Sequence, residues 1–317
     1  MLRAIIASFR QPYLDLSITD RDGQRIRIVE RPGLWMPDTD LAQLAEQLRY
    51  IAGRALPQQN LNYGDFSGSK AAFDRTIVTL ISARGGTPIA FNALAVMDAD
   101  IAPEPVEVLH LGLVMVDPDA RSRSLSWALY GLTCFLIFLR GKMRPRWVSS
   151  VTHVPAVVGM VAETFSEVWP APDARPRRLG HLFLGRSIMT DHRVVFGVGP
   201  EAGFDEDRFV ITDAYRGGSE GLKKRFADAP PHRNPIYGEF CKDRLDYDRG
   251  DDFLQIGLID LAAMRRFLQA EVPKGMVFRL TVTGAMLALQ QLLLPVLYWF
   301  DSDKPWGLLR PQDRGRG

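Results

Sequence analysis

The stretch that decides the fold of this chain is Val106–Ser126, VEVLHLGLVMVDPDARSRSLS, which has the pattern of a strand, a loop and the start of a helix. The apolar run ends at Asp117, and the segment 127–140 that follows the loop is typical of a helix. A loop between a strand and a helix N-terminus collects backbone N–H groups, and the helix dipole adds positive potential. Arg121 and Arg123 can donate charge-assisted hydrogen bonds to phosphate there. The stretch therefore predicts either an anion site or an ordinary strand-to-helix connection.

Composition sets wide limits on what the protein does. The 317 residues are 46% hydrophobic and 24% charged, as expected of a folded protein, and the formal net charge is only +2. A charge so close to zero gives no reason to expect a nucleic-acid partner. The two cysteines, Cys134 and Cys241, form neither a disulfide framework nor a metal-binding spacing. We therefore expect a cytoplasmic protein without a resident metal.

Alternation and spacing of apolar residues predict both strands and helices along the chain. A helix is expected from Leu41 to Ile51, capped by Asp38 or Thr39, and the region 217–252 is expected to hold loops and short helices. Gly112 would allow a bulge in its strand. The predicted strands are 13–19, 25–29, 75–82, 88–97, 107–116, 147–154, 193–198 and 208–211, and the other predicted helices are 125–139, 155–165 and 260–269.

The segment 280–300 contains no charged residue over 21 positions, a length that would span a bilayer core of about 30 Å. Thr283 and Gln290 share one helical face and leave an apolar remainder, and Tyr298 and Trp299 suit a membrane interface. Three interpretations stay open, namely a helix lying in the interface, a buried core helix and a full span. We expect the first, with the protein associated with the inner face of the cell membrane.

The order of the elements from about Ile77 to Tyr215 resembles the GNAT acyltransferase superfamily. In that family a signature Gln/Arg-x-x-Gly-x-Gly/Ala follows the fourth strand, and here the matching residues are Arg121-Ser122-Arg123-Ser124-Leu125-Ser126, with serine at both small positions. The family's Asn-x-x-Ala stretch corresponds to His153-Val154-Pro155-Ala156. The tyrosine that commonly acts as general acid falls at Met160. The whole-chain pattern also resembles bacterial lipid N-acyltransferases such as the ceramide synthases of sphingolipid-producing bacteria.

The resemblance implies an α+β fold, a GNAT-like mixed sheet flanked by helices, over residues 1–215. Residues 216–317 would form a polar loop region and an apolar helical extension. It also implies acyl-CoA as co-substrate, bound by Val116, Arg121, Ser122, Arg123, Ser124, Leu125 and Ser126. The expected reaction transfers an acyl group to a primary amine such as a sphingoid-type long-chain base. Two alternatives stay open: a soluble N-acetyltransferase of a small amine or amino acid, and a non-catalytic acyl-CoA-binding or lipid-binding protein.

Three residues are candidates for catalysis at the gap that this fold opens between strands 107–116 and 147–154. His110 lies in the first strand, and imidazole titrates near neutral pH, so His110 is the first candidate for the base. His153 ends the second strand and would face the same gap. Glu107 is a candidate because family members often place a catalytic carboxylate on this strand. A buried core role for each histidine and a solvated role for Glu107 are the competing interpretations.

Overall fold

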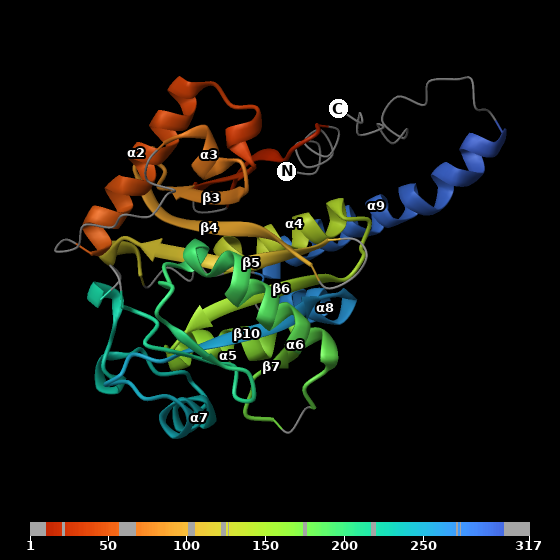
Figure 1. The fold of residues 1–317 in the computed structure, drawn as a ribbon. Coiled ribbons are helices and arrows are strands. Elements are labelled where there is room, and N and C mark those ends of the chain that lie inside the picture. The colour runs from red at the N-terminus through yellow and green to blue at the C-terminus, as the bar shows by residue number, and fades with distance from the viewer. Residues whose placement is uncertain are drawn as a thin grey trace.

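A computed structural model of the chain describes residues 11–300 except 21–22, 57–67, 101–104, 122–124, 126, 174–175, 217–219, 271 and 273. Within these residues the chain forms one mixed sheet of ten strands with helices on both faces (Figure 1). The predicted mixed sheet flanked by helices is therefore confirmed. The strand order is β1-β2-β3-β4-β5-β6-β10-β9-β8, and β7 also pairs with β10.

The first half of the sheet is antiparallel throughout and follows the predicted hairpins. In the first two strands, alternate residues such as Leu16 and Ile28 are buried on one face, and Val29 is buried on the other face under α2. The strands are β1 (Asp15–Thr19), β2 (Arg25–Glu30), β3 (Thr76–Ser82), β4 (Pro88–Ala99) and β5 (Val106–Val116).

The second half of the sheet begins with β6 (Arg146–Thr152), which runs parallel to β5. Its other neighbour is β10 (Asp252–Ile259), which the sequence pattern does not predict. β10 comes from the part of the chain after residue 215, yet it lies between β6 and β9 in the sheet. The expected domain boundary at residue 215 therefore does not separate the sheet from the rest of the chain. The remaining strands are β7 (Ser166–Trp169), β8 (Gly203–Asp205) and β9 (Val210–Thr212).

One face of the sheet is covered by α2 (Asp38–Ala55) over β2–β5 and by α6 (Leu179–Ser187) over β6 and β10. Helix α2 starts after Pro37, so neither Asp38 nor Thr39 is its cap; Asp38 lies in the first turn, where its charge favours the helix dipole. The π-helical turn η5 (Ile188–His192) continues α6. The predicted strand 193–198 is wrong: Arg193–Phe196 forms a 3₁₀ turn, η6, that ends at left-handed Gly197.

The opposite face carries a larger apolar cluster. The π-helical turn η4 (Trp127–Leu132) leads into α4 (Thr133–Arg140), and the buried Asn92 amide donates to the Leu129 carbonyl at 3.0 Å. This bond joins the buried side chain of β4 to the π-helical turn above it. The other helices and turns are η1 (Pro32–Leu34), α3 (Lys70–Phe73), η3 (Pro118–Ala120), α5 (Pro155–Thr164), η7 (Glu220–Leu222), η8 (Phe226–Asp228), α7 (Ile236–Arg244), α8 (Leu261–Ala270) and α9 (Lys274–Phe300).

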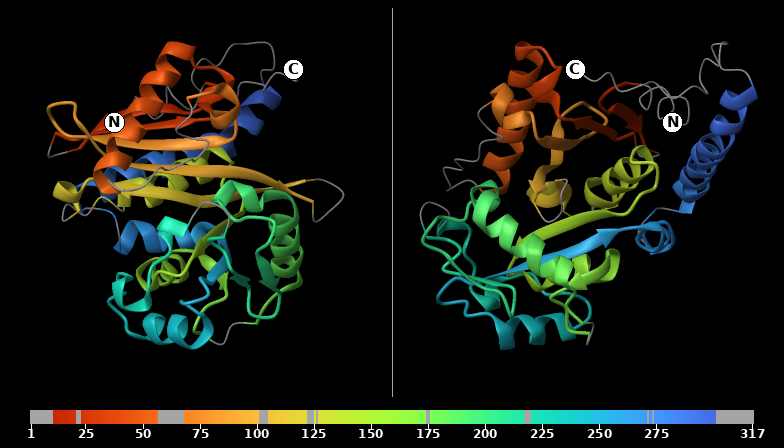
Figure 2. Two further views of the ribbon diagram at one scale, coloured as in Figure 1. Left: turned by 60° about the vertical axis from the view of Figure 1, so that its left-hand side comes forward. Right: turned by 45° about the vertical axis from the view of Figure 1, so that its right-hand side comes forward.

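Helix α9 contains the uncharged segment 280–300. Its first turns pack on the core through Met276, Leu280 and Thr283, and its later turns extend away from the sheet (Figure 2). Leu289 is 55% exposed and Leu292 is 72% exposed. Among the helices within the described residues, none combines the length and the apolar character that a membrane crossing needs.

Candidate active site

The parallel strands β5 and β6 separate part of the way along their length. Their pairing consists of Val108↔Trp147, Leu109↔Val148 and His110↔Ser149, after which β5 continues to Val116 and β6 to Thr152. Both strands end at the same side of the sheet, where β10 begins (Figure 1). The pairing with β6 ends at His110, so the part of β5 beyond it is not part of the β5–β6 ladder.

A bulge in β5 accompanies the separation. Ala95 pairs with His110 and Ala93 pairs with Leu113, so two residues, Leu111 and Gly112, lie opposite one residue of β4. A Cβ atom on Gly112 would lie 2.3 Å from the Ala93 carbonyl oxygen. Only glycine fits this approach, which confirms the bulge expected at Gly112.

His110 lies where the gap begins and is buried. Its Nδ1 lies 3.0 Å from Ser149 Oγ, and its ring lies 5.0 Å from the ring of Phe196 in η6. Burial without a countercharge lowers the pKa of His110 from 6.5 to about 4. The imidazole is therefore neutral at physiological pH and a weak proton acceptor.

His153, directly after β6, has a different environment. Its Nδ1 lies 2.7 Å from Oδ1 of Asp252 and 2.6 Å from the hydroxyl of Tyr215, which itself donates to Asp252 Oδ1 at 3.0 Å. A carboxylate only accepts hydrogen bonds, so the arrangement favours the tautomer with the proton on Nδ1. Nε2 then carries a lone pair, and it is buried without a hydrogen-bond partner among the described residues. The geometry is that of a histidine base oriented by a carboxylate.

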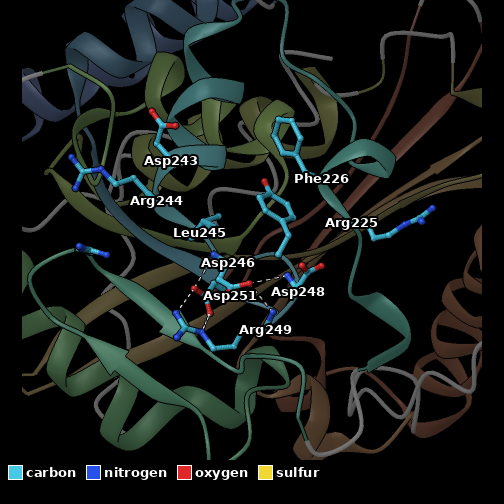
Figure 3. Close-up of a pocket in the computed structure, with 11 residues that line it drawn as sticks. Arg225, Phe226, Asp243, Arg244, Leu245, Asp246, Asp248, Arg249 and Asp251 are labelled. Atoms are coloured by element: carbon cyan, nitrogen blue, oxygen red, sulfur yellow. Dashed lines mark hydrogen bonds and ion pairs between the residues drawn. The ribbon is translucent and has the colours of Figure 1, made fainter.

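The loop Asp246–Asp251 holds this pair in place. The Tyr247 hydroxyl donates to the His153 carbonyl at 2.6 Å, and its ring meets the imidazole edge-on at 5.7 Å. The Arg249 guanidinium donates two hydrogen bonds of 2.7 Å to the buried Asp251 carboxylate (Figure 3). Because Asp251 precedes Asp252, this ion pair fixes the backbone that presents the Asp252 carboxylate to His153.

The two candidate histidines share one face of the sheet but do not touch. Ser149, which contacts His110, is four residues before His153, a separation of about 13 Å along an extended strand. Glu107 lies three strand residues before His110 and therefore points to the other face. Its carboxylate is 42% exposed and pairs with Arg31 at 2.6 Å and Arg146 at 3.3 Å. The structure thus does not bring Glu107 to the gap.

The predicted coenzyme A loop is described only in part. Val116 ends β5, Arg121 is an exposed turn residue, and the carbonyl of buried Leu125 accepts hydrogen bonds from the Ala128 and Leu129 amides of η4. The expected contacts of Ser122, Arg123, Ser124 and Ser126 lie outside the described residues.

The start of this loop is anchored to α2. The Asp117 carboxylate accepts a hydrogen bond of 2.9 Å from the Asp119 amide and pairs with Arg54 near the end of α2. The Arg54 guanidinium also donates to Asp119 Oδ2 at 2.7 Å. The bond from Arg54 holds the pKa of Asp117 below its ordinary value of 3.8. The strand-to-loop junction is therefore fixed next to the gap.

Sequence reasoning missed three residues of the site, namely Asp252, Tyr215 and Tyr247. All three lie in or beside the polar region 217–252, whose turn-forming residues hide the start of β10. The signal that could have revealed the strand is the run Phe253–Ile259, FLQIGLI, directly after the last aspartates.

The cysteines do not supply a nucleophile. Burial raises the pKa of the Cys134 thiol and that of the Cys241 thiol to about 12. No group of three or more histidine, cysteine or acidic side chains in the described part of the chain could hold a metal ion. Comparison with models of known protein families and with characterised proteins gives no match.

Proposed function

We propose that the protein is an acyl-CoA-dependent N-acyltransferase. The observation that carries the proposal is the gap between β5 and β6, with the His153–Asp252 pair at its open end. The order of the elements and the bulge before the gap support the GNAT-like interpretation of the sequence. In such a gap the pantetheine arm of acyl-CoA would take the place of the missing strand contacts, with its pyrophosphate near Arg121 and the following loop.

The chemistry follows from the tautomer of His153. Nε2 accepts a proton from the acceptor amine while the amine nitrogen attacks the thioester carbonyl carbon. Backbone N–H groups on the open edge of β5 stabilise the oxygen as charge develops there. The C–N bond forms, the C–S bond breaks, and the thiolate takes the proton from the imidazolium to give an amide and free coenzyme A. His153 then serves as base and acid, so the reaction does not need a proton donor at Met160.

Helix α9 supports a lipid acceptor and a site of action at the inner membrane face. Phe278, Met286, Leu289 and Leu292 are exposed apolar side chains on a helix with no charged residue from 280 onward. Such a surface suits the interface of a bilayer, where a long-chain amine would reside. We accordingly favour a sphingoid-type long-chain base as acceptor over a small soluble amine.

The test of catalysis measures release of coenzyme A from acetyl-, octanoyl- and palmitoyl-CoA in the presence of short-chain and long-chain amines. The variants His153→Gln and Asp252→Asn should lower kcat by about 10²-fold to 10⁴-fold, the range for loss of a positioned base or its orienting carboxylate. His192→Gln is the matched control, because its ring bonds the Asp98 carbonyl at the other end of the sheet. Binding of coenzyme A without turnover of any donor would favour the non-catalytic alternative. Full activity of His153→Gln would rule out the assigned base.

The test of the membrane surface is flotation with vesicles of neutral and anionic phospholipid. The double variant Leu289→Asp/Leu292→Asp should lose vesicle binding. Leu261→Asp, an exposed leucine of α8 that is 66% accessible, should keep it. Equal flotation of all variants would refute a role for α9, and recovery of acyl transfer only with small amines would favour the soluble alternative.

A further inference from the structure

A cavity of about 600 Å³ lies beside the loop that holds His153. Its volume is within the range of about 300–1,000 Å³ typical of small-molecule sites. Tyr247 and Asp251 line it, so the loop that orients the His153–Asp252 pair also forms the cavity wall. Phe226 meets Tyr247 edge-on at 5.2 Å and extends the aromatic part of that wall. Tyr247 thus lines the cavity and also contacts His153.

Part of the charge around the cavity is already neutralised within the protein. Arg249 is paired with Asp251, as described above. The Asp246 carboxylate accepts hydrogen bonds of 3.0 and 2.9 Å from the amides of Asp248 and Arg249. Arg225 donates to Asp228 at 2.7 Å. These hydrogen bonds and ion pairs stabilise the fold around the cavity, and their charges would contribute little to the binding of a ligand.

Other charged groups of the cavity have no close ion-pair partner among the described residues. The Arg208 guanidinium lies 3.9 Å from a carboxylate oxygen of Asp205. The Arg244 guanidinium lies over the ring of Phe240 at 6.0 Å and forms no ion pair with a described residue. Asp243 lies beside Arg244, and Asp248 lies on the other side of the cavity (Figure 3). The cavity therefore presents two available cations and two carboxylates around an aromatic wall.

We infer that this cavity binds the head group of an amine acceptor that also carries an anionic group, a phosphate or a carboxylate. The anion would be held by Arg208 and Arg244, because guanidinium forks bind these oxyanions with paired hydrogen bonds. This inference rests on the proposed function and narrows the acceptor to amines, long-chain bases included, that also carry an anionic group, since an acceptor without one would leave both arginines without a partner.

Binding is tested without an acyl donor, so that the outcome does not depend on catalysis. Isothermal titration of the full chain uses three probes that share a short amine, namely O-phosphoethanolamine, β-alanine and ethanolamine. At least one of the two anionic probes should bind at least 10-fold more tightly than ethanolamine, and comparison of the two identifies the anion as phosphate or carboxylate. Binding of neither anionic probe, or equal binding of all three, would overturn the inference.

Variants locate the site. The double variant Arg208→Gln/Arg244→Gln should weaken binding of the preferred anionic probe at least 10-fold, whereas Arg265→Gln, an exposed arginine of α8, should leave it within 2-fold. Both substituted arginines are exposed, and circular dichroism checks that the variant is folded. Unchanged affinity in the double variant would refute the site. Tight binding without acyl transfer would refute only the proposed function, and acyl transfer without selective binding would refute only this inference.

Discussion

The bulge at Gly112 gives the sharpest prediction, because it lies where β5 separates from β6. In Gly112→Ala the added methyl group would lie 2.3 Å from the Ala93 carbonyl oxygen, a backbone atom of the neighbouring strand. A side chain could rotate away from such a contact, but a paired strand cannot. Overpacking of a fixed site costs about 1–3 kcal/mol, and we expect the upper end here.

The assay is urea unfolding followed by circular dichroism. With a slope of about 3 kcal/mol per molar urea, a loss of about 3 kcal/mol lowers the midpoint by about 1 M. Gly85→Ala is the matched control, because a Cβ on Gly85 would meet nothing within 4 Å. A midpoint for Gly112→Ala equal to that of Gly85→Ala would show that β5 carries no bulge at this position, and the separation of the strands would need another explanation.

Three further predictions concern groups around the gap. The pKa of His110 is about 4 in the folded chain and 6.5 in the unfolded chain, so protonation favours unfolding. The free energy of unfolding should therefore fall by up to about 3 kcal/mol as the pH drops from 6.5 toward 4. In urea titrations over that pH range, His110→Gln should show a flatter dependence of stability on pH. The pKa of Asp117 is lowered, so the stabilisation that Arg54 gives to its carboxylate is lost only in acid. The difference in stability between wild type and Arg54→Gln should be full at neutral pH and shrink as the pH falls below 3.8. A difference in melting temperature that stays constant with pH would contradict this. Asn92→Ala should cost about 1 kcal/mol by removing its buried hydrogen bond to the Leu129 carbonyl, and unchanged calorimetric stability would show that the amide does not support the π-helical turn.

The antiparallel half of the sheet could be predicted from sequence because its signals are local. Apolar residues alternate on both sides of the turn ending at Gly23, and two runs of apolar and β-branched residues flank Gly85-Gly86, so each hairpin is specified by neighbouring residues. Helix α5 likewise begins at Pro155, as predicted, because proline favours the first helical turn. The strand predicted at 193–198 is wrong although its apolar, β-branched residues are typical of strands. Arg193–Phe196 forms a 3₁₀ turn, and Phe196 packs against His110.

The site was predicted only in part because it depends on distant pairings. His153 could be identified from the end of a recognisable strand, but its partner Asp252 is 99 residues later. No local pattern relates the two positions, and the aspartates before β10 are also typical of a solvated turn. The low pKa of His110 could not be anticipated either, because burial by Phe196 and the lack of a countercharge are tertiary properties.

The central position of β10 has a consequence for how the chain folds during synthesis. A nascent chain that ends before residue 252 has β6 as an unprotected edge, with open backbone groups along Arg146–Thr152. The last strand to emerge must then insert between β6 and β9, a closure over long sequence distances that is intrinsically slow. A partly synthesised chain would thus expose a strand edge that can pair with other chains, and it would also lack Asp252, the carboxylate partner of His153. The candidate site and the sheet are completed by the same late segment.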